Sequence, residues 1–169
     1  HSYVSSGLAS TIMYDKFVNA MPFYRQEKDF KTRFGVTIGR GTMAHWTIYC
    51  AKNYFAPVVE YFERLLNQRK YVAADETPIQ VLKEEGRKAQ SKSYVWLFRS
   101  GDDGQNPMIV YKYHATRNGD AAAEFFKDSN VGTYINVDGY AGYNKLKSFK
   151  RCACYAHIRR YFVSYAEER

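Results

Sequence analysis

An aspartate closes the apolar run of Tyr71-Val-Ala-Ala-Asp75-Glu-Thr-Pro-Ile79, and a second closes the run of Thr133-Tyr-Ile-Asn-Val-Asp138-Gly-Tyr-Ala-Gly-Tyr143, 63 residues later. Runs rich in β-branched and aromatic residues favour strands. A carboxylate at a strand end either reaches solvent or binds a positive group, because burial without a partner is costly. Two such carboxylates suit a two-metal site, where Mg²⁺ ions hold the attacking and leaving oxygens of a phosphodiester. The alternative is that each aspartate only caps a turn or a following helix.

The chain has 169 residues and a hydrophobic fraction of 46%, enough for one domain, alone or with a smaller helical attachment. No apolar stretch approaches the roughly 18 residues that span a membrane, so we expect no membrane partner. The start, His1-Ser-Tyr-Val, lacks the pattern of a secretory leader and lacks Met, which indicates a piece of a longer chain or a cloning scar. The three cysteines are an odd number, which argues against a framework of disulfides. The sequence therefore predicts a protein of the reducing cytoplasm.

The charge balance favours an anionic partner. The chain carries 25 Lys and Arg against 17 Asp and Glu, a net charge of +8, with an isoelectric point near 9.3. Such values are typical of domains that bind nucleic acid. The excess is spread along the chain, so it predicts a basic surface and not a basic tail. The 16 tyrosines could stack on bases or contact phosphates, but we assign most of them to the core and the strand surfaces.

Two cysteines and a histidine lie close together in Cys152-Ala-Cys154-Tyr-Ala-His157. Zinc needs four ligands in a structural site, and no second Cys/His pair exists in the sequence. We interpret the thiols as buried residues of a central strand.

Residues 8–69 are expected to be helical. Apolar residues recur at the spacing of one helix face at Leu8, Ile12, Met13 and Phe17. A second helix is predicted over Phe23–Phe34, with Pro22 in its first turn and Gly35 just past its end.

A third helix is predicted to start at Thr42 as its cap and to run to Leu66, with Pro57 kinking it or splitting it in two. Helix, glycine-containing turn and helix in this order match a helix-turn-helix, which would present Arg40, Thr42 and His45 to DNA. A plain αα-hairpin explains the same residues, and we prefer that interpretation.

From Tyr71 the hydrophobic period changes to that of strands. The expected strands are Val72–Val81, Ser93–Arg99, Met108–His114, Gly132–Val137 and Lys150–Tyr155. The expected helices are Gly119–Lys127, capped by Asn118, a short one over Tyr143–Lys147, and a last one from His157.

Three strands, a helix, a strand, a helix, a strand and a helix are the order of the ribonuclease H-like fold. We therefore predict an α/β fold with a mixed five-stranded sheet and flanking helices over residues 71–169, preceded by an all-α region over residues 1–70. Asp75 then lies on the first strand and Asp138 at the end of the fourth. These are the neighbouring central strands where such a fold gathers its metal-binding carboxylates.

Several motifs resemble those of one family. They are Ala74-Asp-Glu-Thr-Pro78 with Val81, Val137-Asp-Gly-Tyr-Ala-Gly-Tyr-Asn144, Cys154-Tyr-Ala-His157, Arg159-Arg-Tyr-Phe162, Pro22-Phe-Tyr-Arg-Gln-Glu27 and Gly41-Thr-Met-Ala-His-Trp46. In this order, over nearly the whole chain, they resemble the insertion-sequence-66 family of DDE transposases.

The resemblance implies that Asp75 and Asp138 are the first two acidic residues of a catalytic triad that binds Mg²⁺ or Mn²⁺ in a two-metal site. It also implies cleavage and transfer of double-stranded DNA, at transposon ends and target, by a homo-oligomeric complex. Such an enzyme works at the nucleoid in the bacterial cytoplasm.

The resemblance does not extend to the third acidic residue of the family's triad, a Glu on a later helix. Glu167 and Glu168 are the only late glutamates, and no family pattern surrounds them. We therefore expect a catalytic core truncated before that residue and inactive by itself. Glu76 is expected to point to the strand face opposite Asp75, so it is not counted as a ligand.

His157, Arg159 and Arg160 follow the fifth strand and are candidate phosphate contacts, as is Arg117. A tyrosine recombinase would need Arg and His gathered around one Tyr, and the local run at Tyr161 does not provide that. Two alternatives stay open: another ribonuclease H-like nuclease or resolvase, and a DNA-binding or assembly module without catalysis.

Overall fold

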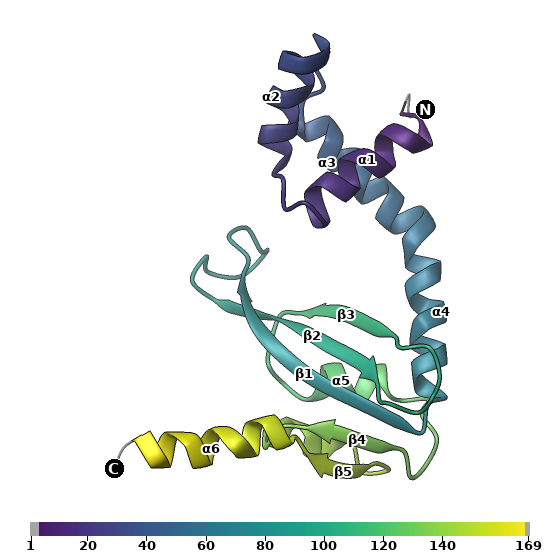
Figure 1. Cartoon of the computed structure of the whole chain (residues 1–169), viewed down its shortest axis with the longest axis vertical. Helices are drawn as coiled ribbons and strands as arrows, with labels where there is room; N and C mark the ends of the chain where they lie inside the picture. Colours follow the sequence, from purple (N-terminus) through teal and green to yellow (C-terminus); the bar gives the residue numbers. More distant parts are fainter. Residues whose placement is uncertain (1–3, 168–169) are drawn as a thin grey trace. The chain divides into compact units, whose positions relative to one another are not determined.

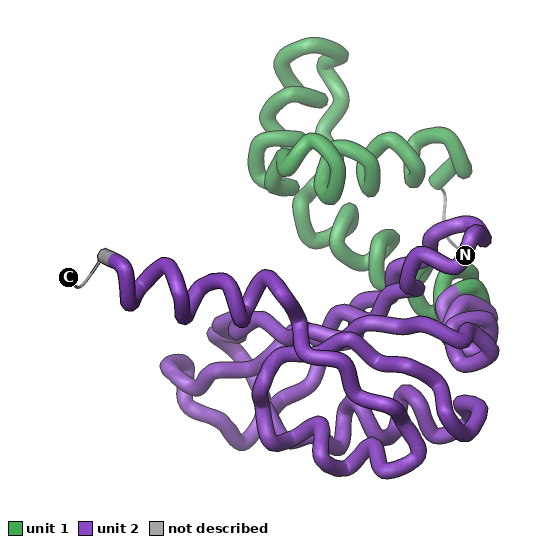
Figure 2. Tube along the Cα trace, turned by 60° about the horizontal axis from the view of Figure 1, so that its bottom comes forward, with its two compact units in different colours: residues 1–58 green, residues 59–169 purple. Residues whose placement is uncertain are grey.

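The computed structural model describes residues 4–167, with the side chain of the last of these excepted, and its chain divides into two compact units between Val58 and Val59 (Figure 2). Each unit has its own internal contacts, and the two are described separately below. None of the helices in the described residues is long and apolar enough to cross a membrane.

The first unit is helical. It contains α1 (Ser6–Phe17), α2 (Phe23–Phe34), α3 (Arg40–Cys50), the π-helical segment η1 (Ala51–Phe55) and the start of α4 (Ala56–Asn67). The buried amide of Gln26 on α2 donates to the carbonyl of Ile12 on α1, at 3.1 Å, and to that of Met21, at 3.0 Å. This side chain therefore ties α1 to α2.

The helices begin and end partly as the sequence predicts. The range Phe23–Phe34 is confirmed, and Gly35 is left-handed at φ 67°, as expected for the residue after a helix. The prediction that Thr42 caps the next helix is wrong, because α3 begins at Arg40 with Gly39 in the cap position. Gly39 adopts the extended backbone that a cap position requires, but it has no side chain to accept a hydrogen bond. In the sequence, glycine therefore indicates a cap less strongly than threonine does.

Pro57 has the expected effect on the long helix, which α3, η1 and α4 form in succession. Proline has no N–H, so the carbonyl four residues earlier loses its usual helical partner. The chain widens into a π-helical turn directly before Pro57, which accommodates that loss.

The second unit is built on a five-stranded mixed sheet, as predicted (Figure 1). Its strands are β1 (Tyr71–Gln80), β2 (Lys92–Ser100), β3 (Ile109–His114), β4 (Tyr134–Val137) and β5 (Lys150–Ala153). They lie in the order β3-β2-β1-β4-β5. β1 pairs antiparallel with β2 and parallel with β4, β2 pairs antiparallel with β3, and β4 pairs parallel with β5.

Three helical elements accompany the sheet: α5 (Asp120–Phe125), the 3₁₀ helix η2 (Ala141–Lys145) and α6 (Tyr155–Glu167). Two of the expected starts are therefore displaced by two residues each. Asn118 does not cap α5: Gly119 occupies the cap position, and the Asn118 amide donates to the Asp120 carboxylate at 2.7 Å.

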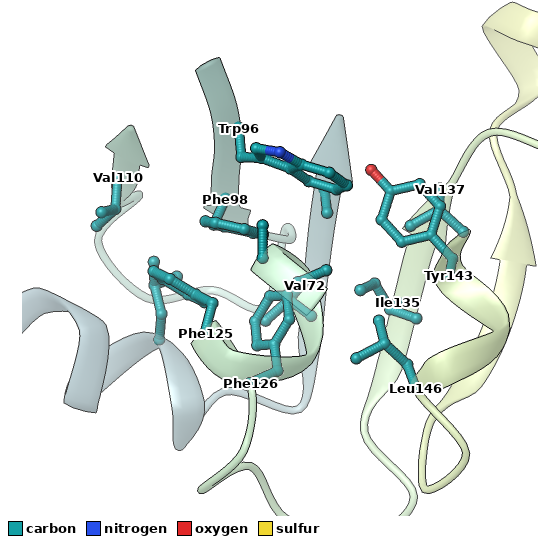
Figure 3. Packing of buried hydrophobic residues seen from close by; sticks show 14 residues of the cluster. Val72, Trp96, Phe98, Val110, Phe125, Phe126, Ile135, Val137, Tyr143 and Leu146 are labelled. Carbon is teal, nitrogen blue, oxygen red and sulfur yellow. The ribbon is translucent and has the colours of Figure 1, made fainter. Parts of the chain in front are cut away.

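The hydrophobic core lies between one face of the sheet and the helices. Figure 3 shows Trp96 and Phe98 of β2 beside Val72, with Ile135 on the neighbouring strand. Phe98 stacks on Phe125 of α5 with ring centroids 3.9 Å apart. Every second residue of β1 and β2 contributes, as the alternation of a strand requires.

The opposite face of the sheet, called the open face below, is exposed at several of the described positions, although Ala73 and Ser93 on it are buried. Tyr111 of β3 is 62% exposed and Ile109 is 51% exposed. The prediction of buried thiols in a central strand is wrong, because β5 is an edge strand, Cys152 is exposed and Cys154 is only half-buried.

Candidate functional site

The strand register brings Asp75 and Asp138 to the same level of the sheet. The parallel ladder pairs Tyr71 with Tyr134 and, two residues later, Ala73 with Asn136. The ladder ends at this pair, so Asp75 and Asp138 each lie two residues beyond it. Asp138 directly follows Val137, the last residue of β4.

The local backbone explains how each carboxylate is held. β4 ends at Val137, and the Oδ1 atom of Asp138 accepts the N–H of Tyr140 at 2.8 Å, which starts the turn into η2. Asp75 is exposed, and its Oδ1 atom accepts the N–H of the next residue, Glu76, at 2.9 Å. One oxygen of each carboxylate thus accepts a backbone N–H, and Oδ2 of Asp138 forms a longer ion pair with Arg117.

Glu76 lies on the core face of β1, where it pairs with Trp96 across the sheet. Its side chain is 0% exposed. The Oε2 atom accepts the hydroxyl of Tyr143 at 2.6 Å, and Oε1 accepts Nε of Arg117 at 2.8 Å. Both oxygens of this carboxylate are occupied within the protein, so it has no free oxygen to offer to a metal ion.

Arg117 connects the buried glutamate to the second aspartate. Its Nη2 atom lies 2.7 Å from Oε1 of Glu76 and 3.7 Å from Oδ2 of Asp138. The guanidinium also lies over the ring of Tyr140, 4.3 Å from its centroid, and the Tyr140 hydroxyl donates to the Arg117 carbonyl. The hydrogen bond to Glu76, above all, raises the pKa of Arg117.

Tyr143 lies on the core side of Glu76. It is fully buried and packs edge-on against Trp96, at 5.8 Å between centroids (Figure 3). Burial raises the pKa of Tyr143 far above its ordinary value, with further contributions from Glu76, Asp138 and Asp75. The phenol therefore stays protonated and acts as a donor, and three carboxylates lie near enough to affect it.

The end of β5 lies beside the end of β4, close to Asp138. The N–H of Cys154 donates to the carbonyl of Val137 at 2.9 Å, so Cys154 is the neighbour of Asp138 across the sheet. Hydrogen bonds from His157 lower the pKa of the Cys154 thiol. The Nδ1 atom of His157 is buried and has no hydrogen-bond partner among the described residues.

The candidate phosphate contacts fall into three groups. Arg159 and Arg160 are exposed on α6, next to His157, which is half-buried. Arg117 is half-exposed and engaged with the carboxylates.

The remaining three lie on α3 in the first unit. Thr42 and His45 are exposed and three residues apart, so they share a face of the helix. Arg40 precedes Thr42 by two residues, about 200° around the helix, and lies over the ring of Tyr24. The structure therefore brings together two of these three side chains and separates the other.

The donor set fits a hard divalent cation in part. Carboxylate oxygens are the ligands that Mg²⁺ and Mn²⁺ prefer, and Mg²⁺ commonly keeps several waters beside one or two carboxylates. Asp75 and Asp138 could supply two such carboxylates. Within residues 4–167, however, no group of three or more His, Cys, Asp or Glu side chains is arranged to hold a metal ion.

Sequence reasoning missed the roles of Glu76, Tyr140 and Tyr143. The available signal was the strand alternation of β1, which puts Glu76 on the face of Val72 and Ala74. An acid on a core face requires a positive partner and further hydrogen bonds. The identity of that partner, Arg117, depends on the loop after β3, which no periodicity predicts.

Comparison with known proteins agrees with the resemblance of the motifs. A search of curated proteins and a search of solved structures found no match to this chain. A family model described as "Transposase IS66 family" matches residues 1–169, the whole chain. The chain therefore belongs to the IS66 family of transposases, whose function is DNA transposition.

Proposed function

We propose that this chain carries the first two catalytic carboxylates, Asp75 and Asp138, of a DDE transposase that cleaves and transfers DNA strands. The observation that supports the proposal is the β1–β4 register, in which Asp75 and Asp138 each lie two residues beyond the last pair of the parallel ladder, Ala73 and Asn136. Family membership supports the same conclusion independently.

The proposed fold of the second unit is ribonuclease H-like. Support comes from the order of elements, β1-β2-β3-α5-β4-η2-β5-α6, and from the sheet order β3-β2-β1-β4-β5. This order makes β1 and β4 direct neighbours and puts β1 in the centre, although 63 residues separate their aligned positions. We propose the boundary between the helical region and this core at residue 70, just before β1.

Asp75 and Asp138 would hold Mg²⁺ or Mn²⁺, as two carboxylates of a two-metal site. Bound there, such cations supply charge stabilisation for in-line attack on a phosphodiester. The chain's own contribution is placement. The β1–β4 ladder would set the spacing of the carboxylates, and the hydrogen bond from the Tyr140 N–H would orient Asp138.

The set of carboxylates is incomplete in the described residues. Glu76 has both oxygens engaged, and the side chains of Glu167 and Glu168 lie outside the part of the chain that is described. We propose that a third acidic residue, a Glu on a later helix, completes the site, and that residues 1–169 alone do not cleave DNA. The active complex is proposed to be a homo-oligomer.

Double-stranded DNA is the proposed partner. The net charge of +8 favours a polyanion, and Arg159 and Arg160 are exposed beyond the end of β5, next to the strand that flanks Asp138. These two arginines are the proposed phosphate contacts on α6.

The test is calorimetric titration with Mn²⁺ of the wild-type chain and of Asp75→Ala and Asp138→Ala. Glu85→Ala is the matched control, because Glu85 is an exposed carboxylate in the β1–β2 loop. We expect weak binding that each aspartate variant abolishes and the control retains. Binding unchanged in both aspartate variants would return Asp75 and Asp138 to turn capping and would favour the non-catalytic DNA-binding module.

A further inference from the structure

Glu76 and Asp75 are adjacent carboxylates with different surroundings. Asp75 is exposed on the open face, whereas the side chain of Glu76 is buried on the core face. An ionised carboxylate is buried only with a charged partner and with its lone pairs satisfied. Arg117 and Tyr143 meet both requirements for Glu76.

Arg117 is shared unequally between two carboxylates. Its Nη2 atom is 2.7 Å from Glu76 but 3.7 Å from Oδ2 of Asp138, which is beyond hydrogen-bond reach. The Tyr140 ring lies against the guanidinium of the same arginine, and the Tyr140 hydroxyl donates to its backbone carbonyl. The guanidinium therefore stays close to Asp138 without occupying that oxygen.

A guanidinium bound to Asp138 would compete with a metal ion for the same oxygen. Positive charge close to a metal ligand also repels a second cation. Glu76 removes both effects, because its Oε1 atom accepts the hydrogen bond of Arg117 Nε, forms an ion pair with Nη2 and neutralises the charge of the guanidinium. The pair carries no net charge beside the candidate site.

We propose that Glu76 is a positioning residue, which retains Arg117 by an ion pair and so keeps Oδ2 of Asp138 available to a divalent cation. The proposal rests on the proposed function, in which Asp138 binds metal. In this proposal Glu76 does not contact the metal ion. It affects the metal site only by holding Arg117.

The test uses Tb³⁺, a hard oxygen-seeking cation whose emission is sensitised by nearby tyrosines, titrated into the full chain. Glu76→Gln keeps the acceptor for Tyr143 but releases Arg117. Its affinity for Tb³⁺ should fall roughly tenfold, the usual scale for loss of a residue that supports a metal ligand. The double variant Glu76→Gln/Arg117→Gln should recover the wild-type affinity, because no guanidinium remains to compete.

The chain offers a matched control in Glu84. This carboxylate accepts hydrogen bonds from Arg87, Ser93 and Tyr113 in the β1–β2 loop, so it has the same kind of partners away from the aspartates. Glu84→Gln should leave Tb³⁺ affinity unchanged. Thermal unfolding of every variant shows that affinity is compared between folded proteins.

The outcomes separate the two proposals. Emission that is unaffected by Asp75→Ala and Asp138→Ala would remove the metal site and, with it, the role of Glu76. A metal site lost in those variants but unchanged in Glu76→Gln would overturn the role of Glu76 alone. Weak binding that the double variant does not recover would mean a structural role and would also overturn it.

If Glu76→Gln does not fold, the affinity of Arg117→Gln for Tb³⁺ tests the role of Glu76 instead. With the positive charge removed, affinity should rise above wild type. An unchanged affinity, or a loss of affinity, would overturn the proposal.

Discussion

The two faces of the central sheet differ in what covers them, and the difference decides what a carboxylate can do. On the covered face, the side chains of Phe98 and Glu76 are buried, and the glutamate is neutralised by Arg117. On the open face, Asp75 and Tyr111 are exposed. Because side chains alternate along a strand, one step from Asp75 to Glu76 changes a carboxylate that is free for a ligand into one that stabilises the fold.

The largest expected effect separates the two faces by stability. Phe98→Ala should cost about 3–5 kcal/mol, because the side chain is fully buried and stacks on Phe125. Tyr111→Ala, one strand away on the open face, should change stability by less than about 1 kcal/mol. Urea unfolding at neutral pH measures both. Similar losses for the two variants would mean that the open face is covered in solution.

The second effect concerns the contact between the loop that carries Arg117 and the helix that follows Asp138. A methyl group on Gly119 would overlap the backbone carbonyl of Gly142, and backbone cannot move aside cheaply. Gly119→Ala should therefore destabilise by about 1–3 kcal/mol, the usual range for overpacking. It should also displace Arg117 from Glu76 and weaken metal binding.

Gly139→Ala is the control for this substitution, since a methyl group there meets nothing within 4 Å although Gly139 directly follows Asp138. It should leave unfolding and Tb³⁺ affinity unchanged. Equal effects of the two alanines would show that the Gly119 contact does not hold the two segments together.

The third effect tests the ion pair at the rim of the covered face. Arg69 and Asp103 are both buried, and the Nη2–Oδ1 distance is 2.5 Å. Hydrogen bonds from Arg69, first among several causes, lower the pKa of Asp103 below its ordinary value. A carboxyl whose pKa is lower in the folded state contributes stability above its unfolded pKa and loses it as the pH falls through the folded one.

The expected result is a urea midpoint that decreases as the pH falls below about 4, the ordinary pKa range of Asp. Asp103→Asn should lower the midpoint at pH 6 and flatten part of this decrease. Asp102→Asn, at the exposed neighbouring position, should keep the wild-type profile. Identical profiles for all three proteins would mean that the pair adds nothing to stability.

The five-stranded mixed sheet was predicted from the sequence, because alternation and turn residues are short-range patterns. The element order also predicted β1 and β4 as neighbours, whereas their register is known only from the structure. Gly35 is the same kind of case, since a left-handed residue after a helix is encoded by a single glycine.

The sequence did not predict what depends on contacts between distant segments. Glu76 and Tyr143 are 67 residues apart and meet only once β1, β4 and η2 are assembled. The expectation for Cys152 failed for the same reason: apolar composition cannot distinguish an edge strand from a central one. Strand order decides that, and it is a property of the whole sheet.

The smallest expected effect tests the basic surface beyond β5, next to the open face. Arg159→Ala and Arg160→Ala should each weaken binding to double-stranded DNA of any sequence and reduce the slope of log affinity against log salt by about one. The folded state should be unaffected, because both side chains are exposed on α6. The effect per residue is small, since a single exposed phosphate contact carries little of the total binding.

Lys83→Ala is the control for these arginines, because Lys83 is an exposed cation in the β1–β2 loop of the same unit. A slope that changes equally in all three variants would mean that DNA responds only to net charge. A slope that changes only with the two arginines would place the DNA backbone along α6. The strand that leads into α6 is the neighbour of β4, so such DNA would run beside Asp138, the partly exposed member of the aspartate pair.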